Sequence, residues 1–148
     1  DTWQPGAHTG TFRGNQLAMK AGTIVLNRVT KPGFLSEVVR KGDKIMARMN
    51  EIKSKTSIIG DVRGKGLMIG CEFVNPKGKA DSNGILPRNG DAAAKVQKLC
   101  FENKLVMEKG GRDGSVMRCL CALTVTDSEI DTAMDIFEKA VLAVDKEY

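Results

Sequence analysis

The sequence predicts an α+β fold: a small, mainly antiparallel sheet of three strands with helices on one face, preceded by a further helix. Four segments repeat apolar residues with the 3.6-residue period of a helix, and three shorter apolar segments fit strands. They follow one another as helix, helix, strand, helix, strand, strand, helix, separated by stretches rich in Gly and Pro. The 148 residues are enough for a domain with a core.

The first two helices are expected at residues 14–29 and 34–55, because Lys31-Pro32-Gly33 interrupts the helical pattern between them. A third helix should begin after Asp91 as its N-cap. A fourth should follow Thr126, because Thr126 and Glu129 have the spacing of a capping box. All four carry an apolar stripe that predicts a buried face.

The strands are expected at residues 67–74, 105–107 and 115–124, with an exposed loop at 75–89 and a turn at 110–114. Alternation along the first strand puts Leu67, Ile69, Cys71 and Phe73 on one face. The glycines before it match neither a Walker loop nor a dinucleotide-binding fingerprint, because Gly66 follows Lys65 and a strand follows the glycines. We interpret these glycines as allowing a bulge or a close backbone approach.

Composition excludes several functional classes. Aromatic residues make up only 5% of the chain, and the 23 basic residues are interleaved with 18 acidic ones, which argues against nucleic-acid binding. No apolar run is long enough to cross a membrane. Cys119 and Cys121 do not have the spacing of a zinc knuckle, and the four cysteines form no disulfide framework, so we predict no metal site and reduced thiols in a cytoplasmic protein.

The stretch His8-Thr9-Gly10-Thr11-Phe12-Arg13-Gly14-Asn15 is a polar loop that leads into a helix. Unpaired N–H groups at a helix N-terminus attract anions, and the hydroxyls of Thr9 and Thr11 add donors, so the loop can hold a phosphate. The alternative is a capped helix start with no ligand. His8, the only histidine, is interpreted as structural or loop-lining, and Arg13 as a surface residue that could assist anion binding.

Arg118 is the most unusual residue of the last predicted strand, because the neighbouring positions are apolar. A guanidinium that is partly buried needs an anionic partner. That partner is either a carboxylate or phosphate ligand, or an internal acid such as Glu72 on a neighbouring strand.

Three sequence runs resemble class III pyridoxal-phosphate aminotransferases. Residues 5–18 (PGAHTGTFRGNQLA) resemble the segment that joins the large and small domains of this family. Residues 62–70 (VRGKGLMIG) resemble the first strand region of its C-terminal domain, and residues 116–126 (VMRCLCALTVT) resemble its last strand. The form with Arg13 and the Cys119-Leu120-Cys121 strand is similar to the diaminobutyrate–2-oxoglutarate branch.

The resemblance implies the C-terminal small domain of a fold type I enzyme at residues 31–148, preceded at 1–30 by a phosphate-binding loop and an interdomain helix. It implies pyridoxal 5'-phosphate as cofactor, with Gly10 and Thr11 binding its phosphate in the other subunit of a homodimer. Arg118 would bind a substrate carboxylate. The reaction would move the terminal amino group of 2,4-diaminobutyrate to 2-oxoglutarate, giving aspartate semialdehyde and glutamate.

The family's Schiff-base lysine lies ahead of the Thr11 motif, whereas the first lysine here is Lys20. We therefore expect a piece of a longer protein, with no catalytic residue of its own, that is inactive alone and poorly packed up to about Val29. The alternatives are another class III ω-amino acid aminotransferase, of 4-aminobutyrate or ornithine type, and a non-catalytic anion-binding or interaction module. In each case the expected ligands are small molecules rather than nucleic acid or membrane.

Overall fold

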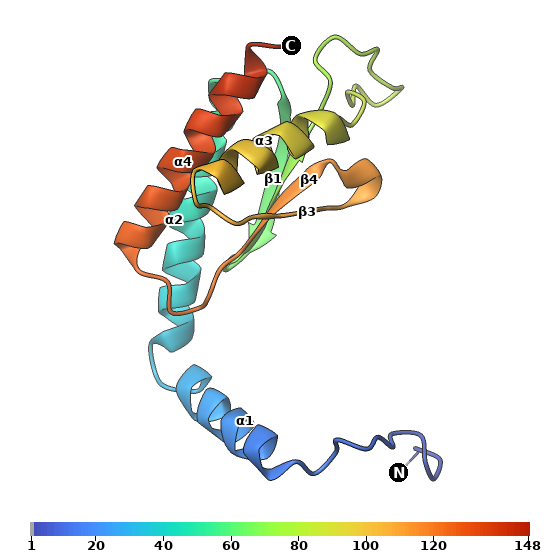
Figure 1. The fold of residues 1–148 in the computed structure, drawn as a ribbon, viewed down its shortest axis with the longest axis vertical. Helices are drawn as coiled ribbons and strands as arrows, with labels where there is room; N and C mark the ends of the chain where they lie inside the picture. Colours follow the sequence, from blue (N-terminus) through green and yellow to red (C-terminus); the bar gives the residue numbers. More distant parts are fainter. Residues whose placement is uncertain (1) are drawn as a thin grey trace. The chain divides into compact units, whose positions relative to one another are not determined.

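A computed structural model describes residues 2–148, so Asp1, where the predicted segment 1–30 begins, lies outside the described residues. The chain divides into two compact units. The first ends at Ser36, and the second runs from Glu37 to Tyr148. Figure 1 shows the elements in order along the chain.

The first unit contains a single complete helix, α1 (Gln16–Val29). Its N-cap is Asn15, whose side chain accepts a hydrogen bond from the backbone N–H of Ala18 at 3.0 Å. The helix expected at 14–29 is therefore confirmed to within two residues. No residue of α1 is buried, which confirms the expectation of poor packing. The exposed large apolar side chains of α1 are Leu17, Met19, Ile24, Val25 and Leu26.

Three further α-helices follow within residues 2–148: α2 (Phe34–Ser54), α3 (Gly90–Glu102) and α4 (Asp127–Asp145). A short 3-10 helix, η1 (Arg112–Gly114), lies between the last two strands. The predicted capping box is confirmed at the start of α4. The predicted cap of α3 was wrong by two residues, because Asn89 rather than Asp91 accepts the hydrogen bond from the N–H of Ala92. None of the helices within residues 2–148 has the length and apolar character that a membrane span needs.

The sheet is antiparallel, as predicted, but has four strands instead of three. They are β1 (Ile59–Lys65), β2 (Met68–Phe73), β3 (Glu108–Gly110) and β4 (Val116–Leu120), in the order β1-β2-β4-β3. The additional strand arises because Gly66, with a φ of 55°, reverses the chain and pairs β1 with β2.

The glycines of this hairpin act as the sequence suggested. Gly60 lies at a register shift between Ile59 and Asp61, which is a bulge. A Cβ at Gly64 would lie 2.3 Å from the carbonyl oxygen of Met68, so the backbones approach closely there. Both interpretations, bulge and close approach, are confirmed.

The last two strands are shifted from their predicted positions. The apolar residues 105–107 precede β3 rather than form it, and Val106 is 80% exposed. The strand predicted at 115–124 is confirmed only as far as Leu120, where β4 ends. Pairing between strands, and not the apolar run itself, sets these boundaries.

One face of the sheet is buried beneath helices, as predicted. Alternation along β2 and β4 sends Ile69, Cys71, Phe73 and Met117 into a core shared with α2, α3 and α4. Figure 1 shows these three helices gathered on one side of the sheet. The opposite face, which includes Gly70 and Arg118, is turned away from these helices.

A row of ion pairs joins the solvent sides of α2 and α4, here called the α2–α4 ion-pair row. Cations on α2, and Lys55 just after its end, meet carboxylates on α4 at N···O distances of 2.7–2.8 Å. The pairs are Arg40–Asp127, Lys44–Asp131, Arg48–Glu138 and Lys55–Glu138. Exposed pairs of this kind stabilise a fold only weakly, so the row mainly orients the two helices.

Candidate functional site

The loop ahead of α1 presents Gly10 and Thr11 on an exposed turn. The backbone N–H of Arg13 donates to the carbonyl of Gly10 at 3.1 Å, and the hydroxyl of Thr9 donates to the carbonyl of Gly6 at 3.2 Å. Asn15 caps the helix, so Thr11 is not needed as a cap. Within residues 2–148, the hydroxyl of Thr11 has no hydrogen-bond partner and remains available as a donor.

The side chain of Arg13 folds back over this turn. A Cβ at Gly10 would lie 3.1 Å from Nε of Arg13, so a larger residue at position 10 would crowd the guanidinium. The turn therefore combines a free hydroxyl with a nearby cation, which is a donor set that suits a phosphate. His8 lies edge-on to Trp3 with ring centroids 5.2 Å apart, consistent with its interpretation as a structural residue.

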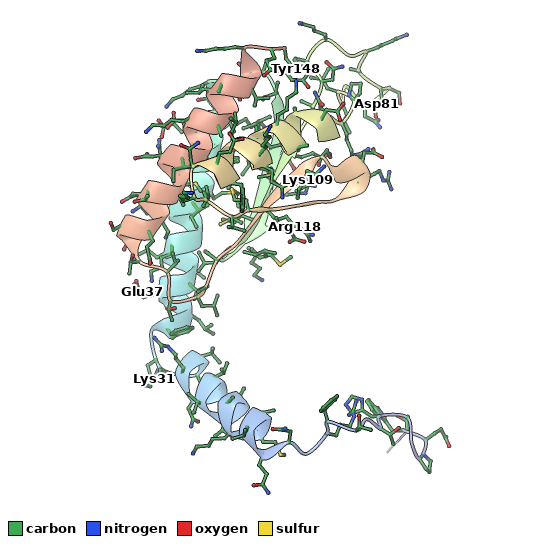
Figure 2. All side chains as sticks on the ribbon, viewed as in Figure 1. Lys31, Glu37, Asp81, Lys109, Arg118 and Tyr148 are labelled. Carbon is green, nitrogen blue, oxygen red and sulfur yellow. The ribbon has the colours of Figure 1, made fainter. Side chains whose placement is uncertain are left out.

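Arg118 lies on the face of β4 that the helices leave open (Figure 2). Its backbone pairs with Gly70 on β2 and with Glu108 on β3. Nη2 of Arg118 donates to the Glu108 carboxylate, and the Arg118 side chain is 39% exposed. Nε of Arg118 is buried and has no hydrogen-bond partner within the described residues. The Glu108 carboxylate thus balances the charge of the guanidinium at Nη2, while the donor Nε has no acceptor within the described residues.

Glu72, which the sequence suggested as an internal partner of Arg118, pairs with other residues. It accepts from Arg63 at 2.7 Å and from Arg88 at 2.9 Å. The register explains this correction, because Glu72 lies opposite Val116, two residues away from Arg118. The internal salt bridge exists, but Glu108 makes it.

Glu108 and Gly110 next to Arg118 were missed by the sequence reasoning. Both lie on β3, where Glu108 pairs with Arg118 and Gly110 with Val116. Counting outward from the predicted turn at 110–114 places residue 108 opposite residue 116, whereas the observed register pairs Glu108 with Arg118, so the predicted turn did not point to this pair. The structure therefore groups Arg118 with Glu108 and Gly110 in the second unit, while Gly10 and Thr11 belong to the first.

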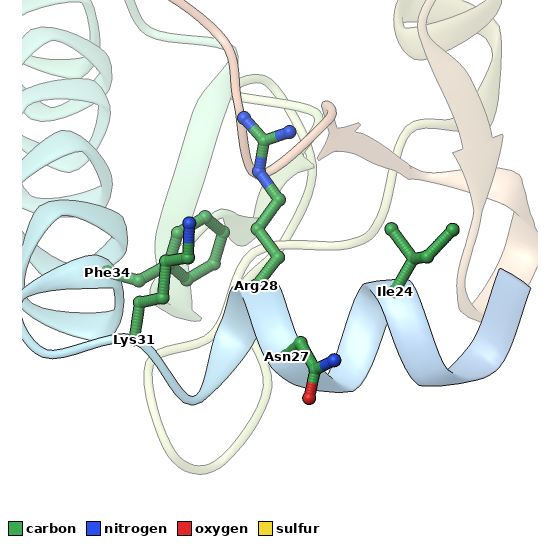
Figure 3. Close-up of a pocket in the computed structure, with 5 residues that line it drawn as sticks. All are labelled: Ile24, Asn27, Arg28, Lys31 and Phe34. Carbon is green, nitrogen blue, oxygen red and sulfur yellow. The ribbon is translucent and has the colours of Figure 1, made fainter.

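A shallow hollow lies within the first unit, where α1 ends and α2 begins (Figure 3). Its volume is about 570 Å³, and it is lined by Ile24, Asn27, Arg28, Lys31 and Phe34. Two of these residues are cations and two are apolar, and no acid or nucleophile is among them. The hollow offers surface for packing or anion contact but no residue set for chemistry.

The protein-family model for class III aminotransferases matches residues 1–141. Two relatives are named diaminobutyrate–2-oxoglutarate aminotransferase. The one from Haemophilus influenzae is 40% identical over 142 residues, which are 96% of this chain and 31% of the relative. The one from Rhizobium meliloti is 43% identical over 131 residues, which are 88% of this chain and 28% of the relative. The chain thus spans about a third of the length of these relatives.

The fold is also found in solved structures. A transaminase from the marine bacterium Virgibacillus superposes with a TM-score of 0.79 at 20% identity, covering 95% of this chain and 31% of that one. At this identity the similarity concerns the fold. Together with the family match along nearly the whole sequence, it shows that the chain belongs to the class III aminotransferase family.

Proposed function

We propose that this chain is the C-terminal part of a pyridoxal-phosphate-dependent aminotransferase that moves the terminal amino group of 2,4-diaminobutyrate to 2-oxoglutarate. The products are aspartate semialdehyde and glutamate. The observation that carries the proposal is the 40–43% identity, over most of the chain, to two relatives named diaminobutyrate–2-oxoglutarate aminotransferase. When bound, pyridoxal 5'-phosphate supplies the carbonyl that takes up the amino group and the ring that withdraws electrons.

Gly10 and Thr11 hold the cofactor phosphate in this proposal. Within residues 2–148 the Thr11 hydroxyl makes no hydrogen bond, and Arg13 adds positive charge over the same turn. Such a turn donates to phosphate oxygens without first breaking a protein contact. By resemblance to the family, the turn serves the site of the other subunit in a homodimer.

Arg118 holds a substrate carboxylate. A guanidinium carries five N–H donors, and the contact with Glu108 occupies only Nη2. Nε has no partner within the described residues, so a carboxylate that reached it would satisfy a buried donor. Both proposed substrates are carboxylates, which is the ligand chemistry that this side chain recognises.

The 148 residues alone are proposed to be inactive. The resemblance puts the lysine that binds the cofactor ahead of Thr11, whereas Lys20 is the first lysine here. We also propose a cytoplasmic location, because the four cysteines are free, as is usual in a reducing compartment.

Activity of the intact aminotransferase tests the proposal directly. With L-2,4-diaminobutyrate and 2-oxoglutarate, glutamate should form in proportion to aspartate semialdehyde. The 148-residue chain with added pyridoxal phosphate should form neither. Turnover with 4-aminobutyrate or ornithine but not with diaminobutyrate would replace the proposed donor, and turnover by the 148-residue chain would contradict its proposed inactivity.

Cofactor affinity tests the role of Thr11. Thr11→Val in the intact enzyme should weaken binding of pyridoxal phosphate about 10- to 100-fold, because a hydrogen bond to a charged group is lost. Thr9→Val is the matched control, since the Thr9 hydroxyl already donates to Gly6. Equal affinity of the two variants would show that Thr11 does not bind the phosphate.

A further inference from the structure

The guanidinium of Arg118 lies directly across Gly110. A Cβ built on Gly110 would lie 2.6 Å from Nη2, 3.1 Å from Cζ and 3.3 Å from Nε of Arg118. Contacts below 3.0 Å are essentially never made by a real Cβ, so no side chain at position 110 is compatible with this position of the guanidinium. The space that Arg118 occupies therefore exists because residue 110 is glycine.

The strand register explains this contact. Glu108 lies opposite Arg118, and Gly110 lies two residues further along β3, on the same face. The long Arg118 side chain donates to Glu108 from Nη2, while Nη2, Cζ and Nε occupy the space that a side chain at position 110 would need. Glu108 and Gly110 together thus fix the orientation of the guanidinium, the first by charge and the second by shape.

The backbone at Gly110 does not itself require glycine. Its φ is outside the left-handed region, unlike that of the next residue, Gly111, whose φ is 71°. Alanine at position 110 is therefore compatible with the strand. The clash would be with the far end of a flexible side chain, so the guanidinium would move while the fold is kept.

We propose that Gly110 is a positioning residue that sets where the Arg118 guanidinium meets the carboxylate of an amino-acid or 2-oxo-acid substrate. This inference rests on the proposed function of Arg118 and adds the residue that determines its geometry. Displacement of a binding group by a fraction of an ångström to one ångström is enough to weaken an oriented contact strongly. Gly110 thereby contributes to the recognition of carboxylate substrates without touching them.

Gly70 provides a matched control in the same sheet. Its backbone pairs with Arg118 on β2, and it lies on the same open face. A Cβ at Gly70 would approach Val116 Cγ1 at 3.0 Å and the carbonyl of Arg63 at 3.9 Å, but no atom of Arg118 within 4 Å. Alanine at position 70 thus tests a crowded sheet position without displacing the guanidinium.

The experiment compares Gly110→Ala, Gly70→Ala, Arg118→Ala and the Gly110→Ala/Arg118→Ala double variant in the intact aminotransferase. The KM values for L-2,4-diaminobutyrate and 2-oxoglutarate are measured, with propane-1,3-diamine as an amino donor that lacks the carboxylate. Gly110→Ala should raise about tenfold the same KM that Arg118→Ala raises, with kcat changed less than about twofold. The half-reaction with the diamine, measured without a 2-oxo acid, should stay within about twofold of the parent enzyme in every Gly110 variant, and so should both KM values of Gly70→Ala.

The double variant and the crystal structures separate positioning from simple loss of structure. Once Arg118 is removed, Gly110→Ala should have no further effect on KM, because both changes act through one group. In crystals, the guanidinium should be displaced in Gly110→Ala and unmoved in Gly70→Ala. Additive effects on KM, or an unmoved guanidinium in Gly110→Ala, would overturn the inference.

The kinetics of Arg118→Ala distinguish a failure of the proposed role of Arg118 from a failure of the inference about Gly110. If Arg118→Ala raises neither KM, Arg118 does not bind a substrate carboxylate, and the inference is overturned along with that role. If Arg118→Ala raises a KM but Gly110→Ala matches Gly70→Ala, the role of Arg118 stands and only the inference about Gly110 is lost.

Discussion

Helices α1 and α4 show that similar local sequence signals lead to different burial. Both begin with a side-chain cap, and both carry spaced apolar residues. In α4, six residues are buried in the core, whereas in α1 none is. Periodicity thus identifies which face of a helix is apolar, but only a partner surface converts that face into a core.

The largest difference in unfolding free energy between α4 and α1 variants should come from truncation of a buried aromatic side chain in α4. Phe137 on α4 is fully buried, so Phe137→Ala should lower the free energy of unfolding of the 148-residue chain by about 3–5 kcal/mol. Leu17 on α1 is 83% exposed, and Leu17→Ala should change it by less than about 0.5 kcal/mol. Urea denaturation measures both, and similar losses would show that α1 packs as α4 does.

Glycine-to-alanine changes should have opposite signs in the two regions. A Cβ at Gly42 on α2 would lie 2.2 Å from the carbonyl oxygen of Gly66, so Gly42→Ala should destabilise the second unit by about 1–3 kcal/mol. Nothing lies within 4 Å of a Cβ at Gly22 on α1, so Gly22→Ala should increase helix stability by about 0.5–1 kcal/mol. Denaturation midpoints and far-UV circular dichroism test the pair, and equal signs would contradict the prediction.

Removal of the two helix caps should also affect α4 and α1 differently, with smaller changes in stability. Thr126→Ala should cost about 1 kcal/mol in cooperative unfolding, because the capping box with Glu129 is lost and α4 is part of the core. Asn15→Ala removes an equivalent cap but should only fray α1, with faster amide exchange at its first turn. A shift of the cooperative transition by Asn15→Ala would mean that the two units unfold together.

The smallest effect is expected in the α2–α4 ion-pair row and depends on pH. The hydrogen bond from Arg40, assisted by Lys44, lowers the pKa of Asp127 to about 2. Partial burial acts in the opposite direction and raises this pKa, but less strongly. Because this pKa is below the ordinary value of about 3.9, the contribution of Asp127 to stability is present above about pH 4 and is lost as pH falls through about 2.

Asp127→Asn should therefore flatten the acid side of the stability profile. Compared with the parent chain, the variant should lose less stability between about pH 4 and about pH 2, and its denaturation midpoint should respond less to added salt. Asp43→Asn on α2 is the control, since Asp43 belongs to no ion pair within residues 2–148. An unchanged acid slope in Asp127→Asn would show that the pair with Arg40 does not stabilise the fold.

The sequence was least informative about strand pairing. Residues 105–107 are apolar and fit a strand by composition, yet the backbone pairs with β4 only from Glu108 onward. The single strand expected around residues 67–74 is the second half of a hairpin, because the Gly66 turn adds β1. Hydrogen bonding between consecutive strands decided both cases, and the apolar pattern of a single segment does not contain that information.

The candidate site was predicted in part. The chemistry of Thr11 and Arg118 as anion-binding side chains follows from residue type and local context, and their roles stay predictions that the experiments above address. The choice of Glu108 over Glu72 as the internal partner of Arg118 depended on register. Two residues along a strand is the distance to the next side chain on the same face, and that side chain has a different neighbour on the adjacent strand. A register difference of two residues is therefore enough to change the partner of Arg118.

The sequence by itself determined the α+β class, the helices to within a few residues, the capping box and the family, because these depend on short-range patterns and conspicuous motifs. Only the tertiary structure decided the fourth strand, the burial of α4 but not of α1, and the seat of Arg118 on Gly110 beside Glu108. Those features depend on which surfaces meet across the fold. The energies of contacts between separate segments are not contained in the apolar pattern of any one segment.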